Sequence, residues 1–280
     1  MLADYHVHTY YSDDSDYPME EVVKDAIALG LDEICFTDHV DYGVKRDHDD
    51  PRGMLKREFD GVVLSNVDYP KYFAEINSLR KKYEGKINIK QGLEFGIQTT
   101  TIDDFERLFN KYPLDFVIMS VHQVDNLEFW EQDFQRGKTQ DEYNYLYYKE
   151  ILDVIKVYKD YSILGHIDSI VRYDLAGEYP FEKIRDIVTE ILKTAISDNK
   201  GIEINTSCFR YGLKDLTPSR DIIRLYKELG GKIITIGSDS HKKEHLANKI
   251  KETKKELLDM GFEYYCTYDK MTPTFHRLDD

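Results

Sequence analysis

Two histidines near the start of the chain, His6 and His8, are separated by one residue in the segment Asp4-Tyr5-His6-Val7-His8. Alternate residues of a β-strand point to the same face, so both imidazoles share a face if this segment is a strand. Two adjacent imidazoles suit metal coordination, although such a pair also arises by chance. The pair therefore carries weight only if other strand ends supply matching ligands.

Similar polar side chains follow each of the other strands that the sequence predicts. In parallel α/β barrels the carboxyl ends of the strands gather at one face, where active sites are built. We therefore expect these side chains to converge, although they are spread along the chain. The segments are Asp14 in the turn after the first strand, Thr37-Asp38-His39, Gly92-Leu93-Glu94, Ser120-Val121-His122, Gly165-His166, Glu203-Ile204-Asn205-Thr206-Ser207 and Gly237-Ser238-Asp239-Ser240-His241.

Histidine is concentrated at these strand ends. Imidazole and carboxylate groups together suit Zn²⁺, Mn²⁺ or Fe²⁺. Taken singly, each side chain has an ordinary alternative as a hydrogen-bonded, ion-paired or buried group, but the set favours metal. With Asp14, Glu94 and Asp239 there are too many ligands for one ion, so we expect a cluster of two or three, with Glu94 able to bridge. Six of the nine histidines take part: His6, His8, His39, His122, His166 and His241.

Short β-rich runs alternate with amphipathic helical stretches, which is the pattern of parallel βαβ units. Seven strands suit a closed or nearly closed parallel barrel, and no linker divides residues 1–280, so a single domain is expected. The strands are predicted at Ala3–His8, Glu33–Thr37, Ile87–Glu94, Phe116–Val121, Ser162–His166, Gly201–Asn205 and Lys232–Gly237. Helices are predicted at Met19–Leu29, Lys71–Tyr83, Asp103–Asn110, Glu142–Lys159, Phe181–Asn199, Ser219–Leu229 and Lys243–Met260.

Two long segments, Gly43–Asp68 and Val124–Gln140, lack clear periodicity and are candidate lids or mobile loops. The second of them carries Trp130 and Phe134. Surface positions are expected for the three remaining histidines, which are His48, His245 and His276.

The composition favours a soluble cytoplasmic protein. The chain of 280 residues is 41% hydrophobic and 32% charged, and it has no apolar run of membrane-spanning length and no secretory signal. Cys35, Cys208 and Cys266 are odd in number and widely spaced, which argues against a disulfide framework. The formal net charge of −15 argues against a nucleic-acid-binding surface. The oligomeric state does not follow from the sequence.

The strand-end segments, from the His6-Val7-His8 motif to Gly237-Ser238-Asp239-Ser240-His241, resemble the PHP family, named for polymerase and histidinol phosphatase. They run in family order and cover residues 4 to 241, and the pieces Glu203–Ser207 and Arg210 look most like the histidinol-phosphate phosphatase branch. The resemblance implies a distorted (β/α)7 barrel with up to three metal ions at the carboxyl ends of the strands. It also implies three ligand groups. These are His6, His8, Glu94 and Asp239 for the first ion, Glu94, His122 and His166 for the second, and Asp14, His39 and His241 for the third.

The position of Asp14 is histidine in some relatives, so the resemblance implies a third site that is tuned differently or binds metal more weakly here. The implied activity is hydrolysis of L-histidinol phosphate to L-histidinol and phosphate, in histidine biosynthesis. A metal-bridging hydroxide held by Glu94 and Asp239 would attack phosphorus in line, because a metal cluster lowers the pKa of bound water and neutralises phosphoryl oxygens. Asp239, His39 and a metal-bound water are all candidates for the general acid.

Two arginines are candidate phosphate contacts because the guanidinium group grips phosphate bidentately. Arg172 follows His166 by six residues, and Arg210 follows Ser207 by three. Candidates for contacting the imidazole and amine of the substrate are Asp41, Tyr42, Asp125, Glu128 and Trp130. Two alternatives stay open: an enzyme of this type acting on another small phosphomonoester or nucleotide, and a metal-binding accessory domain without activity.

Overall fold

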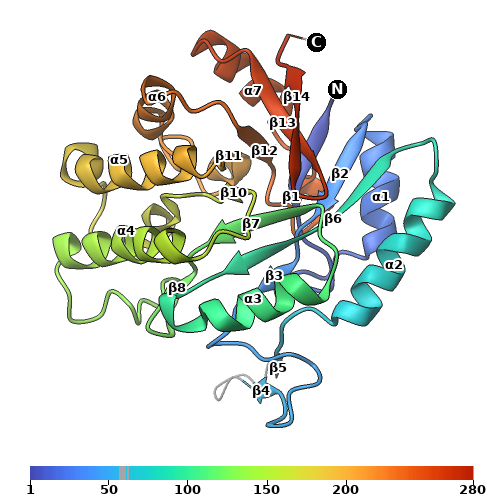
Figure 1. Cartoon of the computed structure of the whole chain (residues 1–280), viewed down its shortest axis with the longest axis horizontal. Coiled ribbons are helices and arrows are strands. Elements are labelled where there is room, and N and C mark those ends of the chain that lie inside the picture. The colour runs from blue at the N-terminus through green and yellow to red at the C-terminus, as the bar shows by residue number, and fades with distance from the viewer. Residues whose placement is uncertain (57–60, 62, 280) are drawn as a thin grey trace.

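The computed structural model describes residues 1–56, 61 and 63–279 (Figure 1). Seven strands form one parallel sheet in the spatial order β1-β2-β6-β7-β10-β11-β12. Their bounds are β1 Ala3–Val7, β2 Glu33–Phe36, β6 Asn88–Gly96, β7 Phe116–Ser120, β10 Ile163–Leu164, β11 Gly201–Asn205 and β12 Ile234–Gly237. The short strand β3 (His39–Val40) also pairs with β6, placing His39 beside Glu94. The carboxyl end of β6 therefore lies between β3 and β7.

The first and last strands meet and nearly close the sheet into a barrel. The amide of His8 donates to the carbonyl of Ser240 at 2.8 Å, and the amide of Ser240 donates to the carbonyl of His6 at 3.2 Å. The buried carboxylate of Asp4, on the same strand β1, adds to this closure: it accepts hydrogen bonds from the amides of Ser238 and Ala247, both at 2.9 Å. The prediction of a seven-stranded parallel barrel is confirmed.

Helices surround the barrel on the outside (Figure 1). In α1 the buried residues Met19, Val22, Val23 and Ala26 recur with helical spacing, so one apolar stripe packs against the strands. Helix α4 begins with a capping box in which Thr139 and Glu142 satisfy each other's backbone amides. The bounds are α1 Met19–Ala28, α2 Tyr69–Lys82, α3 Ile102–Lys111, α4 Gln140–Val157, α5 Phe181–Ser197, α6 Arg220–Glu228 and α7 Ile250–Asp259.

The carboxyl-terminal part of the chain differs from the sequence prediction. The helix predicted at Lys243–Met260 is wrong in its first half: a 3₁₀ turn, η4 (Lys243–His245), is followed by an irregular stretch. Helix α7 begins only after Lys249, whose φ of +61° lies in the left-handed region and cannot continue a right-handed helix. His245 lies in that 3₁₀ turn and is half-buried rather than exposed.

A hairpin of β13 (Tyr264–Asp269) and β14 (Thr272–Arg277) was not predicted. It packs against the amino-terminal end of the barrel, where the amide of Tyr268 donates to the hydroxyl of Tyr5 at 2.6 Å. Lys270 and Met271 adopt the left-handed φ angles of its turn. Glycine usually occupies such positions, so the sequence lacks the residue that would have predicted this turn. His276, expected at the surface, is half-buried in β14, with Nε2 2.8 Å from the hydroxyl of Thr267. His48 is exposed as predicted.

Where the structure describes them, the two long segments contain only short strands and turns. Gly43–Asp68 contains the short strands β4 (Leu55–Lys56) and β5 (Val63–Leu64), and residues 57–60 and 62 lie outside the described part of the chain. The other segment begins with a small hairpin of β8 (Gln123–Val124) and β9 (Leu127–Glu128). A lid function for either segment stays a prediction. Within the described residues, none of the helices has the length and apolar character needed to span a bilayer.

Candidate metal centre

The nine predicted ligands all lie around the carboxyl end of β6, where Glu94 is fully buried. One carboxylate oxygen of Glu94, Oε2, faces Nε2 of His6 at 3.1 Å and Nε2 of His8 at 3.5 Å. The other oxygen, Oε1, faces Nε2 of His122 at 3.1 Å and Nε2 of His166 at 2.8 Å. Glu94 thus presents one oxygen to each of two groups of imidazoles, as a bridging carboxylate would.

Asp239 completes the group around His6 and His8. Its Oδ1 atom lies 3.9 Å from Nε2 of His6 and 3.6 Å from Nε2 of His8. Asp239 lies two residues after the end of β12 at a left-handed φ of +55°, a conformation that non-glycine residues adopt at a cost and that is concentrated at functional sites. The ligand atoms of these three residues lie within 4.8 Å of one another, close enough to share an ion.

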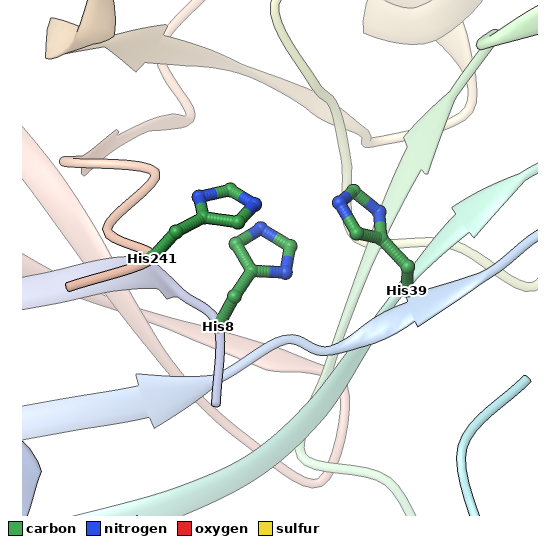
Figure 2. Close-up of side chains that lie close together, drawn as sticks. All are labelled: His8, His39 and His241. Carbon is green, nitrogen blue, oxygen red and sulfur yellow. The ribbon is translucent and has the colours of Figure 1, made fainter. Parts of the chain in front are cut away.

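A third group lies at the mouth of the barrel. Oδ2 of Asp14 is 3.1 Å from Nε2 of His241 and 3.6 Å from Nε2 of His39. The ring of His8 stacks against both histidines, with centroids 4.1 Å from His241 and 4.2 Å from His39. Figure 2 shows these three rings, which come from three different segments, turned toward one another. The structure therefore brings together every member of the three groups that the sequence suggested.

Four of the six imidazoles have a partner on Nδ1 that is not itself one of the predicted metal-binding atoms. A partner on one ring nitrogen fixes the tautomer and leaves the other nitrogen free to bind a metal. None of these four pairings was predicted from the sequence, in which Asp41 was a candidate substrate contact and Glu203 and Ser12 had no individual role, because hydrogen-bond partners depend on how strands and turns pack in three dimensions. The pairs are His6 with Oε1 of Glu203 at 2.6 Å, His8 with the Ser12 hydroxyl at 3.2 Å, His122 with Oδ1 of Asp41 at 2.7 Å and His241 with the Asp239 carbonyl at 2.9 Å.

The electrostatics of the centre favour a cation. Although burial alone would raise it, the pKa of Glu94 is held well below its usual range by His6, His122 and His39. Burial, together with the charges of His241 and His39, holds the pKa of His8 well below its usual range, so this imidazole is neutral. Its buried Nε2 has no hydrogen-bond partner among the described residues. A neutral imidazole nitrogen without a partner beside ionised carboxylates is the donor set that divalent metal ions require, so these residues fit a metal centre.

The two candidate phosphate contacts differ in what they touch. Arg172 lies in the 3₁₀ turn η2 (Ser169–Tyr173), where its Nη2 donates to the Ser207 hydroxyl at 2.7 Å and its Nη1 lies 3.3 Å from Oδ2 of Asp239. Its buried Nε has no hydrogen-bond partner among the described residues. Arg210 instead donates to the backbone carbonyls of Ser238 and Asp239 at 2.9 and 2.7 Å. Arg172 therefore has a donor to offer inside the site, whereas Arg210 braces the segment that carries Asp239.

A cavity opens onto the metal centre, and Arg172 forms part of its wall. Among the candidates for contacting the rest of the substrate, Asp41, Glu128 and Trp130 also line it. Tyr42 lines a neighbouring groove, and Asp125 occupies the turn between β8 and β9. The cavity is bounded by Asp14, His39, Asp41, Lys45, His122, Gln123, Glu128, Phe129, Trp130, His166, Ser169, Arg172, Tyr173, Tyr211, Asp239 and His241.

A comparison with known families agrees with this geometry. The family model described as PHP domain matches residues 4–207. The chain belongs to the PHP family. The match includes seven of the nine clustered residues, and the last segment of this PHP protein adds Asp239 and His241.

Relatives of this PHP protein match it over nearly its whole length. A histidinol-phosphatase of Lactococcus lactis is 34% identical over 96% of this chain and 94% of the relative. A probable histidinol-phosphatase of Clostridium acetobutylicum is 30% identical over 91% of this chain and 92% of the relative. The solved structure of histidinol phosphate phosphatase from Lactococcus lactis, complexed with zinc, L-histidinol and phosphate, superposes with a TM-score of 0.81 at 34% identity and covers 98% of both chains.

Proposed function

We propose that this protein is a metal-dependent phosphatase that hydrolyses L-histidinol phosphate to L-histidinol and phosphate, with residues 1–280 forming one catalytic domain. The observation that carries the proposal is the buried carboxylate of Glu94, whose Oε1 faces ring nitrogens of His122 and His166 while its Oε2 faces ring nitrogens of His6, His8 and His39. The relatives named as histidinol-phosphatases support the choice of substrate. The Lactococcus lactis structure, described as a complex with L-histidinol and phosphate, supports it further.

The proposed centre holds two or three divalent ions, with zinc, manganese and iron as the candidates. Bound ions of this kind supply an activated water near neutral pH and neutralise charge on the phosphoryl oxygens. Zinc is favoured by the Lactococcus lactis structure, which contains it. The proposed ligand groups are His6, His8, Glu94 and Asp239 for the first ion, Glu94, His122 and His166 for the second, and Asp14, His39 and His241 for the third.

The side chains around the cavity bind and orient the substrate. Ser207 and Asp239 engage the two terminal nitrogens of Arg172 and fix its orientation, and Nε, which has no hydrogen-bond partner among the described residues, is the proposed donor to the phosphate group. Trp130 and Tyr173 offer aromatic faces to the imidazole, and Glu128 offers negative charge to the amine. Arg210 is a second proposed phosphate contact, because it lines a groove together with Asp14 and His241, and it also donates to the carbonyl of Asp239. The small polar cavity and the net charge of −15 favour a small phosphate ester over nucleic acid.

The test compares steady-state rates on L-histidinol phosphate, sugar phosphates and nucleotides, using protein whose metal content has been measured by elemental analysis. The proposal expects kcat/KM for L-histidinol phosphate to exceed the others by orders of magnitude, because the amine and imidazole add binding energy that simple phosphomonoesters lack. Equal rates across the panel would indicate a phosphatase that is not specific for L-histidinol phosphate. No hydrolysis by fully metal-loaded protein would refute the enzymatic function.

A further inference from the structure

We propose that Asp41 is a positioning residue that fixes the orientation and tautomer of His122, and that Lys45 holds Asp41 in place for this role. The inference rests on the proposed function, because it takes His122 to be a metal ligand. It adds two residues to the centre, both from the segment that follows β3 and neither of them a ligand in the proposed groups.

The contact between Asp41 and His122 determines which ring nitrogen faces the centre. Oδ1 of Asp41 lies 2.7 Å from Nδ1 of His122, while Nε2 of the same ring lies 3.1 Å from Oε1 of Glu94. A neutral imidazole carries one N–H, and a carboxylate only accepts hydrogen bonds. Both ring nitrogens face a carboxylate oxygen, so once a metal ion takes the lone pair of Nε2 on the Glu94 side, the proton is on Nδ1 and Asp41 accepts it. A carboxylate on the far nitrogen also makes the ring a stronger donor to a metal.

The other oxygen of Asp41 is held by a lysine. Nζ of Lys45 lies 3.0 Å from Oδ2 of Asp41 and 2.7 Å from Oδ1 of Asp13, in the turn that leads to Asp14. The amide of Asp41 also donates to Oδ1 of Asn66 at 2.9 Å. Asp41 is thus fixed at its backbone and at both oxygens, and only 3% of its surface is exposed. These contacts engage the whole carboxylate in the protein, so we do not assign it to the amine of a substrate.

The backbone of β6 leaves room for this pair at Gly96. A Cβ atom at this position would lie 1.9 Å from Oδ1 of Asp41 and 2.8 Å from Nδ1 of His122. Distances this short are excluded by van der Waals repulsion, so any side chain at position 96 would displace the contact. The glycine, two residues after Glu94 on the same strand, is what lets the Asp41–His122 pair approach the centre.

A competing possibility is that Asp41 is itself a metal ligand, because Asp41, His39 and His122 offer donor atoms within 4.8 Å of one another. In that arrangement His122 would bind through Nδ1, the nitrogen nearest to Asp41. The positioning role requires the opposite, with a proton on Nδ1 and metal on Nε2. The two possibilities therefore predict different imidazole spectra.

The experiment measures metal affinity and imidazole tautomer in the same proteins. Wild type, Asp41→Asn, Lys45→Met and His122→Ala are equilibrated with zinc buffers of graded free concentration, and bound zinc is measured by elemental analysis. Asp115→Asn is the matched control, because it removes another buried, ion-paired carboxylate at the amino-terminal end of β7, where Asp115 pairs with Arg80 at 2.6 Å. Long-range ¹H–¹⁵N spectra of the zinc-loaded proteins identify the protonated nitrogen of His122.

The proposal expects Asp41→Asn to weaken one zinc equivalent by about 10- to 100-fold, the range typical for removing the partner of a metal-binding histidine. The same equivalent is lost in His122→Ala and weakened less in Lys45→Met, whereas Asp115→Asn binds zinc as wild type does. Wild-type His122 shows a proton on Nδ1. If Asp41→Asn fails to fold, Lys45→Met and the wild-type spectrum still decide the matter.

Three results would overturn the inference, and they differ in what else they overturn. Wild-type zinc affinity in both Asp41→Asn and Lys45→Met, with one equivalent lost in His122→Ala, refutes the positioning role alone. A zinc-bound Nδ1 in wild-type His122 makes Asp41 a ligand instead. If His122→Ala keeps every zinc equivalent, the proposed ligand groups themselves are wrong.

Discussion

Replacing Arg172 with alanine tests the proposed phosphate contact most directly. The side chain is 6% exposed, forms part of the cavity wall and is held by Ser207 and Asp239. Its guanidinium also lies over the ring of Tyr211, 4.9 Å from the centroid. The substrate phosphate would therefore meet a donor group whose orientation is already fixed, and alanine removes both the charge and the fork.

The expected loss of kcat/KM follows from the one guanidinium nitrogen of Arg172 that has no hydrogen-bond partner in the described part of the chain. Nη1 and Nη2 are engaged by Asp239 and Ser207, whereas Nε has no hydrogen-bond partner among the described residues. A hydrogen bond between charged groups contributes about 1.5–3 kcal/mol. Since 1.36 kcal/mol corresponds to a tenfold change in rate, kcat/KM for Arg172→Ala should fall by about 10- to 150-fold. Arg172→Lys should lie in between, because it keeps the charge and loses the planar fork.

The assay is steady-state release of phosphate from L-histidinol phosphate, with zinc content measured on the same preparations. Arg220→Ala is the matched control, because Arg220 pairs with Glu256 at 2.6 Å at the start of α6, outside the cavity. It should lose stability but keep kcat/KM. Arg172→Ala with full metal content and kcat/KM within about threefold of wild type would refute the assignment of Arg172 to the phosphate.

Three further predictions concern the metal ions and the base of the barrel. Removing metal with a chelator should abolish turnover, and adding zinc or manganese should restore it; activity in verified metal-free protein would contradict the mechanism. His6→Ala should lose one metal equivalent and turnover while circular dichroism shows an intact fold, because Glu94, His8 and Asp239 cannot complete the site alone. Burial raises the pKa of Glu33, so the folded state holds its proton more tightly than the unfolded state, and stability should fall as pH rises through that pKa. The difference in Tm between wild type and Glu33→Gln, measured from pH 4 to 8, should shift against wild type as pH rises, and a constant difference would contradict this.

Much of the fold could be predicted because its signals are local. Strand β11 runs from Gly201 to Asn205 as predicted, since the β-branched residues Ile202 and Ile204 alternate with polar residues shortly after the end of a helix. Strand β10 is shorter than predicted, and one reason is that the hydroxyl of Ser162 accepts the amide of Val117 where a backbone carbonyl would continue the ladder. The β13–β14 hairpin was missed because four of the six residues of β13 are buried. Its sequence therefore lacks the alternation of apolar and polar residues by which a half-buried strand is predicted.

The sequence by itself determined which residue types stand at the strand ends, and the rule that parallel strands end at one face was enough to bring His6, Glu94 and Asp239 together. Only the tertiary structure decided which nitrogen of each imidazole faces the centre. It also decided that Arg172 faces the cavity while Arg210 braces a backbone segment. The physical reason is that tautomer and orientation depend on contacts between distant segments, such as the 2.6 Å pair of His6 and Glu203, and such contacts leave no periodicity in the chain.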